Sequence, residues 1–112
     1  MNRSLRLTRR AEESLAQIAR WTIESFGTAQ ADRYEMDLLD RCREICEGRA
    51  LSRSCAVLAE DAADLRFTRA GEHFLVFLDD PEEVVIVDIL HSRSDLPRHV
   101  AALGQAKGVR GN

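Results

Sequence analysis

The sequence predicts an α+β domain of two layers, in which a hairpin of two helices packs on a small antiparallel sheet. Residues 9–47 show two stretches of helical periodicity, and residues 65–90 contain three short strand-like runs. A glycine separates the first two of these runs, and a proline separates the last two. The expected order is β-α-α-β-β-β with a short C-terminal helix, and helices segregated from an antiparallel sheet define the α+β class.

The N-terminal part predicts a short edge strand followed by an amphipathic helix. Leucine alternates with arginine in Ser4–Leu7, which is typical of a strand. From Arg9 to Phe26, apolar residues recur at helical spacing and charged residues fall on the opposite side. The Thr8 hydroxyl is placed to cap this helix, and Gly27 is placed to end it.

A second amphipathic helix is expected from Thr28, as its cap, to about Glu47, where Gly48 ends it. Its apolar side includes Tyr34, which we expect to point to the core. Because one glycine and one capping residue separate the two helices, we expect an antiparallel helix hairpin. This hairpin must cover one face of the sheet, since the helices have nothing else to pack against.

The sheet is expected to form from three consecutive antiparallel strands. Leu65–Arg69 alternates apolar and polar residues and stops at Gly71. Phe74–Leu78 and Val84–Leu90 are longer apolar runs, and the acidic stretch between them contains Pro81. Proline cannot continue a strand ladder, so this stretch is a hairpin turn.

Two segments outside the meander are harder to assign. The apolar run Cys55–Leu58 either packs under the sheet or begins a strand. After the meander, Leu96–Leu103 carries a small apolar side and predicts a short helix that Gly104 ends. We therefore expect a single domain over residues 1–103 and a flexible tail over residues 104–112.

The two strands of the central hairpin are apolar on both faces. A sheet with one solvated face alternates apolar and polar residues, and residues 74–78 and 84–90 do not. One layer of helices covers only one side. Either Cys55–Leu58 and Leu96–Leu103 fold over the second side, or a protein partner does, since exposed apolar patches are usually interaction surfaces.

Composition narrows the class of protein. A net charge of −3 argues against binding nucleic acid through bulk charge. Three cysteines without a Cys-x-x-Cys motif indicate buried thiols in a reducing cytoplasm and no metal site. The N-terminus lacks the apolar region of a signal peptide, and no apolar run reaches membrane-spanning length. We expect a cytoplasmic protein without a cofactor.

Several motifs in this order resemble the RelE/ParE superfamily of bacterial toxins, and within it the ParE branch. They span nearly the whole chain, and the last of them is the most specific. The motifs are Leu15-x-x-Ile18, Phe26-Gly27-x-x-Gln30-Ala31-x-x-Tyr34, Leu65-Arg66-x-x-Arg69-x-Gly71-x-His73 and Ile89-Leu90-His91-x-Arg93-x-Asp95-Leu96-Pro97-Arg98.

The resemblance implies the toxin of a type II toxin–antitoxin pair. Such a toxin is neutralised by a ParD-like antitoxin, so a hetero-oligomer with the antitoxin is expected. The described target of ParE-like toxins is DNA gyrase. We expect the antitoxin or target to contact the apolar sheet face and the arginines around it. The candidate binding residues are Arg66, Arg69, Leu75, Phe77, His91, Arg93 and Arg98.

The alternative function is a RelE-like, ribosome-dependent mRNA interferase. Such an enzyme activates a ribose 2′-hydroxyl, stabilises the phosphorane and protonates the leaving oxygen. His91 and Arg93 are the candidates for acid–base and phosphate-binding roles. The only tyrosine is Tyr34 and the only lysine is Lys107, so a full set of basic residues is missing. We therefore favour a toxin that acts by binding, without strong direct contact to nucleic acid.

Overall fold

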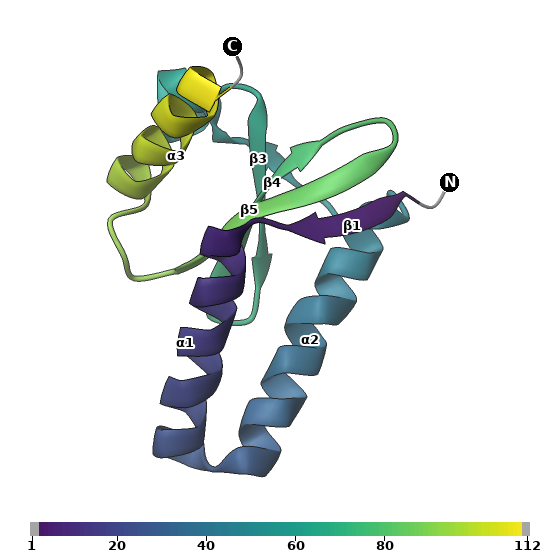
Figure 1. Cartoon of the computed structure of the whole chain (residues 1–112), viewed down its shortest axis with the longest axis vertical. Coiled ribbons are helices and arrows are strands. Elements are labelled where there is room, and N and C mark those ends of the chain that lie inside the picture. Colours follow the sequence, from purple (N-terminus) through teal and green to yellow (C-terminus); the bar gives the residue numbers. More distant parts are fainter. Residues whose placement is uncertain (1–2, 111–112) are drawn as a thin grey trace.

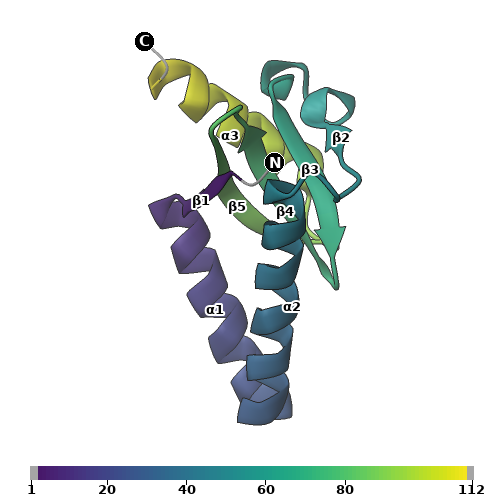
Figure 2. The same ribbon diagram turned by 90° about the vertical axis from the view of Figure 1, so that its right-hand side faces the viewer.

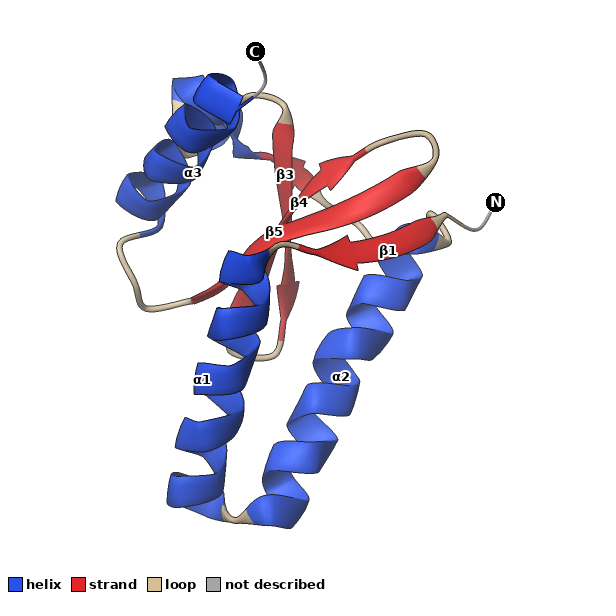
Figure 3. Cartoon of the chain, viewed as in Figure 1, coloured by secondary structure: helices blue, strands red, loops and turns tan. Residues whose placement is uncertain are grey.

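The computed structural model describes residues 3–110 and has the predicted α+β class (Figures 1 and 3). Three helices accompany one sheet in the described chain. The elements are β1 (Ser4–Leu7), α1 (Arg9–Phe26), α2 (Thr28–Cys46), β2 (Arg53–Ser54), β3 (Leu65–Ala70), β4 (His73–Asp79), β5 (Glu83–His91) and α3 (Leu96–Arg110), with 3₁₀ turns η1 (Cys55–Val57) and η2 (Glu60–Ala62).

The sheet has the strand order β1-β5-β4-β3-β2. β1 lies at one edge, as predicted, and runs parallel to β5, whereas the other pairs are antiparallel. The opposite edge is the two-residue strand β2, which pairs with Phe67 and Arg66 of β3 and was not predicted. Two residues are too few to show a strand period, so the sequence carries no signal for β2.

The helix boundaries follow the local signals closely. The Thr8 hydroxyl accepts a hydrogen bond of 3.1 Å from the backbone N–H of Ala11, which confirms the predicted cap of α1. Gly27, at a φ of 94°, joins the two helices and is itself the capping position of α2. The prediction that Thr28 caps α2 is therefore wrong, because Thr28 is already the first helical residue.

The helix hairpin covers one face of the sheet, as expected. The buried side chains between them come from α1, α2 and the inward face of β3, β4 and β5. They are Ala11, Leu38, Cys42, Ile45, Cys46, Ala70, Leu75, Phe77, Val84, Ile86 and Ile89. The far ends of α1 and α2 extend beyond the sheet (Figures 1 and 2). Burial raises the pKa of the Cys42 thiol to about 11, so this cysteine packs as an apolar residue.

The second face of the sheet is covered by the chain itself. The turns η1 and η2 and the helix α3 pack there in a second buried cluster. Its members are Cys55, Ala62, Leu65, Phe67, Val76, Val87, Leu90, Val100 and Leu103. Of the two alternatives for this face, the structure shows the intramolecular one, so the expectation that a partner contacts an apolar sheet face left open by the helices is wrong.

Helix α3 continues through Gly104 to Arg110, so the prediction that it ends at Gly104 is wrong. A Cβ atom on Gly104 would lie 2.7 Å from the carbonyl oxygen of Asp61. The glycine therefore lets α3 approach the backbone of η2 closely, instead of ending the helix. The predicted tail is helical up to residue 110, and residues 111–112 lie outside the described chain.

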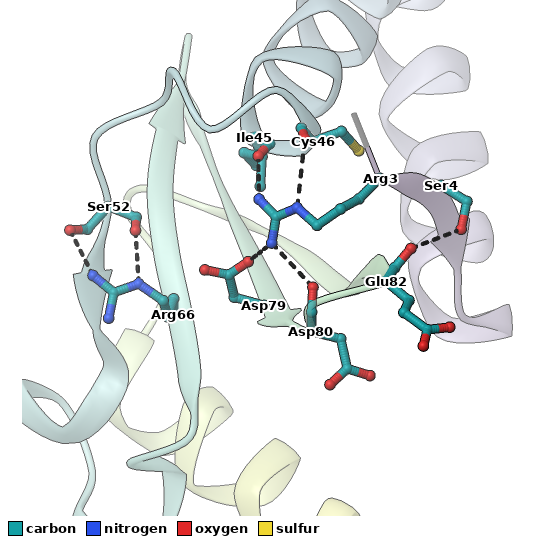
Figure 4. Close-up of polar contacts among 9 residues, drawn as sticks. All are labelled: Arg3, Ser4, Ile45, Cys46, Ser52, Arg66, Asp79, Asp80 and Glu82. Carbon is teal, nitrogen blue, oxygen red and sulfur yellow. Dashed lines mark hydrogen bonds and ion pairs between the residues drawn. The ribbon is translucent and has the colours of Figure 1, made fainter. Parts of the chain in front are cut away.

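Arg3 joins three parts of the chain that are distant in the sequence (Figure 4). Its guanidinium donates to the carbonyl of Ile45 at 2.8 Å and to that of Cys46 at 3.4 Å, at the end of α2. The same group bonds the carboxylate of Asp79 and, at 3.1 Å, the carbonyl of Asp80 in the β4–β5 turn. A cation at a helix C-terminus also interacts favourably with the helix dipole.

Replacing Arg3 by alanine is expected to lower the free energy of unfolding by about 1.5–3 kcal/mol, the usual range for hydrogen bonds to a charged group. Urea denaturation measures this loss. Arg6→Ala is the matched control, because the Arg6 side chain is 58% exposed and its ion pair with Glu83 lies on the surface. Equal losses for the two variants would contradict a joining role for Arg3.

Candidate functional site

A hollow of about 430 Å³ lies between α1 and the adjacent ends of β4 and β5. This volume is within the range of small ligand pockets. Its lining contains apolar side chains and two imidazoles but no carboxylate. The residues are Ser14, Gln17, Ile18, Trp21, His73, Ile89 and His91, and we call this feature the histidine hollow.

The sheet register brings the two histidines together. His73 is the first residue of β4 and His91 is the last residue of β5, and they are direct partners in the antiparallel ladder. Their ring centroids are 5.1 Å apart and the ring planes are nearly perpendicular. The neighbouring turns are also joined, since the backbone N–H of Ser92 donates to the carbonyl of Glu72 at 2.9 Å.

Tyr34 of α2 contacts His73 and fixes the position of its ring. The Tyr34 hydroxyl lies 2.6 Å from Nδ1 of His73 and accepts a hydrogen bond of 2.8 Å from the backbone N–H of Glu72. Tyr34 is half-buried, so its expected orientation toward the core holds only for its ring, and its hydroxyl has a polar partner. The tyrosine ties α2 to the β3–β4 turn.

Gly71 makes this contact possible. The residue has a φ of 62°, and a Cβ atom there would lie 2.7 Å from the Tyr34 ring. Only glycine combines this backbone conformation with such a close approach. Tyr34, Gly71, His73 and His91 come from three separate sequence motifs. These motifs carry the family resemblance, but their spacing does not show that the four residues lie in contact.

Hydrogen bonding fixes which ring nitrogen carries the proton in neutral His91, but not in His73. Burial, with a smaller effect of His91, lowers the pKa of His73 to about 4, so His73 is neutral near pH 7. The Tyr34 hydroxyl pairs with Nδ1 of His73 in either tautomer, because it can donate to a bare nitrogen or accept from an N–H while it donates to the Ala70 carbonyl at 3.4 Å. Nδ1 of His91, in contrast, accepts from the backbone N–H of Arg93 at 3.0 Å, which leaves Nε2–H as a donor in the neutral ring.

The lowered pKa of His73 predicts a loss of stability in mild acid. Between pH 6.5 and about 4 the unfolded chain binds a proton at this residue and the folded chain does not. The free energy of unfolding should therefore fall as the pH drops through this range, and the His73→Gln variant should show a weaker slope. Urea denaturation at several pH values tests this. His99→Gln, at an exposed position, is the control, and an unchanged slope in His73→Gln would contradict the assignment.

Two of the predicted binding residues belong to the core. Leu75 is 0% exposed and Phe77 is 2% exposed, and both side chains lie under the helix hairpin. No partner reaches them in this fold, so their assignment to a binding surface is wrong. The sequence shows that this strand is apolar on both faces, but it does not show which face the helices cover.

The predicted arginines have different surroundings. Arg66 is half-buried and donates to Oγ of Ser52 at 2.7 Å and to the Ser52 carbonyl at 3.0 Å (Figure 4), which holds the loop before β2. Arg69 is exposed and lies over the ring of Phe74. Arg93 and Arg98 are exposed, the first in the turn after His91 and the second in the first turn of α3.

A second hollow adjoins the first and has a polar lining. It shares Ser14, Gln17, Ile89 and His91 with the histidine hollow, and adds Arg10, Glu13, Asp88, Leu90, Ser94 and His99. Asp88 is 6% exposed and accepts hydrogen bonds from the Ser14 hydroxyl at 2.6 Å and from the Ile89 N–H at 2.7 Å. Sequence reasoning missed Asp88, although a single carboxylate inside the apolar run 84–90 was a usable signal.

The far half of the helix hairpin exposes large apolar side chains. Trp21 is 60% exposed and Phe26 is 64% exposed, and their rings are in edge-to-face contact at 5.7 Å. Ile23 and Met36 are also exposed. The apolar spacing of Arg9–Phe26 predicts that Phe26 lies on the covered side of α1. Its ring contacts Trp21 and is otherwise largely exposed, at the end of a helix hairpin that extends beyond the sheet (Figure 2).

The described residues give no sign of a metal centre or a membrane segment. No group of three histidine, cysteine, aspartate or glutamate side chains in the described chain is arranged to hold a metal ion. Within residues 3–110, every helix is too short or too polar to cross a bilayer.

Fold and site together define a class of small α+β domain, with a helix hairpin on one face of the sheet and a hollow beside it. A family model described as the ParE toxin of the type II toxin–antitoxin system parDE matches residues 5–96. The chain therefore belongs to the ParE toxin family.

A solved structure shares this fold. The structure, titled "Chromosomal ParDE TA system from P. aeruginosa", is 16% identical in sequence and superposes with a TM-score of 0.66. The match covers 80% of this chain and 95% of that chain, and at this identity it shows the fold alone. No curated protein matches the sequence.

Proposed function

We propose that this toxin acts in the cytoplasm by binding DNA gyrase, and that a ParD-like antitoxin neutralises it. The observation that carries the proposal is the match of residues 5–96 to the ParE toxin family. The described target of toxins that this chain resembles is gyrase, and its poisoning leaves cleaved DNA.

The geometry of the histidines supports binding more than RNA cleavage. A general base for a ribose 2′-hydroxyl needs an unprotonated nitrogen within reach of the substrate. In neutral His91, Nδ1 is occupied by the Arg93 N–H and Nε2 carries the proton, so the ring offers a donor. Nδ1 of His73 is likewise occupied, by the Tyr34 hydroxyl. His91, which the sequence offers as the acid–base residue, is therefore not prepared to act as the base.

The antitoxin surface that we propose is the exposed far half of the helix hairpin together with the histidine hollow. Trp21 belongs to both, because it lines the hollow and contacts Phe26. Large apolar side chains rimmed by polar residues are typical of protein-binding surfaces. Of the residues predicted from the sequence, His91 lines this hollow. Arg69, Arg93 and Arg98 are exposed outside it and remain proposed contacts of the antitoxin or target.

A gyrase cleavage assay tests the target. The purified chain is mixed with gyrase, ATP and supercoiled plasmid, and the reaction is stopped with detergent and protease. We expect linear plasmid to accumulate. In cells, induction of the chain should trigger the DNA-damage response and leave mRNA intact. Codon-dependent cleavage of mRNA on ribosomes, without linear plasmid in the gyrase assay, would contradict the proposal and support the interferase alternative.

Arg93→Ala is expected to weaken toxicity or antitoxin binding without unfolding the domain. The Arg93 side chain is exposed and has no hydrogen-bond partner among the described residues. Its backbone N–H donates to His91. Surface substitutions of this kind usually change stability by less than about 0.5 kcal/mol. Growth after induction and a thermal melt of the purified variant measure the two effects. A large loss of thermal stability would make Arg93 structural instead.

A further inference from the structure

We propose that the histidine hollow binds an acidic side chain that is flanked by apolar residues, within a peptide segment of a protein partner. If the proposed function holds, that partner is the antitoxin. This inference therefore rests on the proposed function for the partner's identity, but the chemistry of the hollow follows from its own residues.

Two imidazoles are adjacent in the hollow, and neutral His91 carries its hydrogen on Nε2. Nδ1 of each ring is used, by Tyr34 in His73 and by the Arg93 backbone in His91. Every buried polar side-chain atom in the described chain has a hydrogen-bond partner. Nε2 of His73 has no partner among the described residues, so this atom is accessible to solvent. Nε2–H of His91 can therefore donate to an incoming acceptor, and His73 adds a second donor in the tautomer whose Nδ1 accepts from Tyr34.

The lining of the hollow favours an anionic acceptor. It contains no aspartate or glutamate, and its remaining polar groups are the Gln17 amide and the Ser14 hydroxyl. Ser14 already donates to Asp88, which directs that hydroxyl's hydrogen toward the second hollow. A carboxylate accepts two or more hydrogen bonds at once, and bonds to an ionised acceptor are stronger than neutral ones.

The apolar walls determine what flanks the carboxylate. Ile18, Trp21 and Ile89 surround the imidazoles, and Trp21 continues into the exposed contact with Phe26. A peptide that places its acidic side chain on the imidazoles therefore lays its neighbouring side chains on these walls. A basic side chain fits less well, since its N–H groups would face the Nε2–H donor of His91 and find no carboxylate in the lining.

Two blocked tripeptides that differ in one group test this inference. N-acetyl-Leu-Glu-Leu-amide carries the carboxylate, and N-acetyl-Leu-Gln-Leu-amide replaces it with a neutral amide. Each is titrated into the ¹⁵N-labelled full chain, and NMR follows the imidazole nitrogens and the indole N–H of Trp21, the only tryptophan. We expect the glutamate peptide to shift the Nε2 signals of His73 and His91 and the indole signal, with about tenfold higher affinity than the glutamine peptide.

Equal affinity for the two peptides, or shifts that spare the imidazoles, would overturn the inference. Neither peptide experiment needs antitoxin or gyrase. If the chain prefers the glutamate peptide but does not poison gyrase, only the proposed function is refuted. If the chain poisons gyrase but binds both peptides equally, only this inference is refuted.

A pair of variants at His91 separates the loss of the Nε2–H donor from an effect on folding. His91→Gln can keep an N–H near the position of Nε2, whereas His91→Asn can keep only an acceptor near the position of Nδ1 for the Arg93 N–H. We expect His91→Gln to retain the preference for the glutamate peptide and His91→Asn to lose it, with the same melting temperature. Full retention of the preference in His91→Asn would show that His91 is not the donor.

Discussion

Replacing Phe77 by alanine is expected to destabilise the fold by about 3–5 kcal/mol, the usual cost of removing a buried aromatic ring. Phe77 is 2% exposed and belongs to the cluster between the sheet and the helix hairpin. The loss combines the transfer free energy of the ring with the cavity that remains. Urea denaturation followed by circular dichroism measures it, and the variant should unfold at much lower denaturant concentration.

Phe26→Ala is the matched control for this change. It removes the same side chain from the far end of α1, where the ring is 64% exposed, and should cost less than about 0.5 kcal/mol. The two variants should also separate in function, because only Phe26 is available to a partner. Similar stability of both variants, together with loss of antitoxin binding in Phe77→Ala alone, would restore Phe77 to the binding surface.

Val100→Asp is expected to cost about 3–5 kcal/mol, since it places an unpaired charge in the cluster under α3. Val100 is 0% exposed and packs with residues of η1, η2 and the second sheet face. The variant should release α3 and expose that face, so it should bind the dye ANS and aggregate more readily. Dye fluorescence and the unfolding free energy measure the two consequences.

Ala102→Asp is the control on the same helix. Ala102 is exposed, so the new carboxylate stays in water and should change stability by less than about 0.5 kcal/mol. If Val100→Asp were as stable as Ala102→Asp, α3 would not cover the sheet as described.

Local signals predicted most of the fold. The spacing of apolar residues in Arg9–Phe26 and the cap at Thr8 determine α1, and the proline in the acidic turn separates β4 from β5. These features depend on residues close in the chain. Gly104 was misread because glycine ends many helices, and only the position of Asp61 shows that close packing requires it there.

The arrangement of the site depended on contacts between distant residues. The pairing of His73 with His91 follows from the register of β4 and β5, including a register shift between Val76 and Phe77 that no local pattern shows. Both apolar faces of the central strands were visible in the sequence. Which segment covers each face was not, and for this reason Leu75 and Phe77 were assigned to a surface that the helices in fact bury.

The placement of any partner depends on the chain covering both faces of its own sheet, and amide hydrogen exchange of the isolated chain tests this most directly. Exchange is slow where a helix is packed and fast where it frays in solution. We expect the amides of residues 100–103 in α3 to exchange as slowly as those of residues 86–89 in β5. Fast exchange in α3 beside a protected β5 would show that the second face is open, and would return that face to the partner.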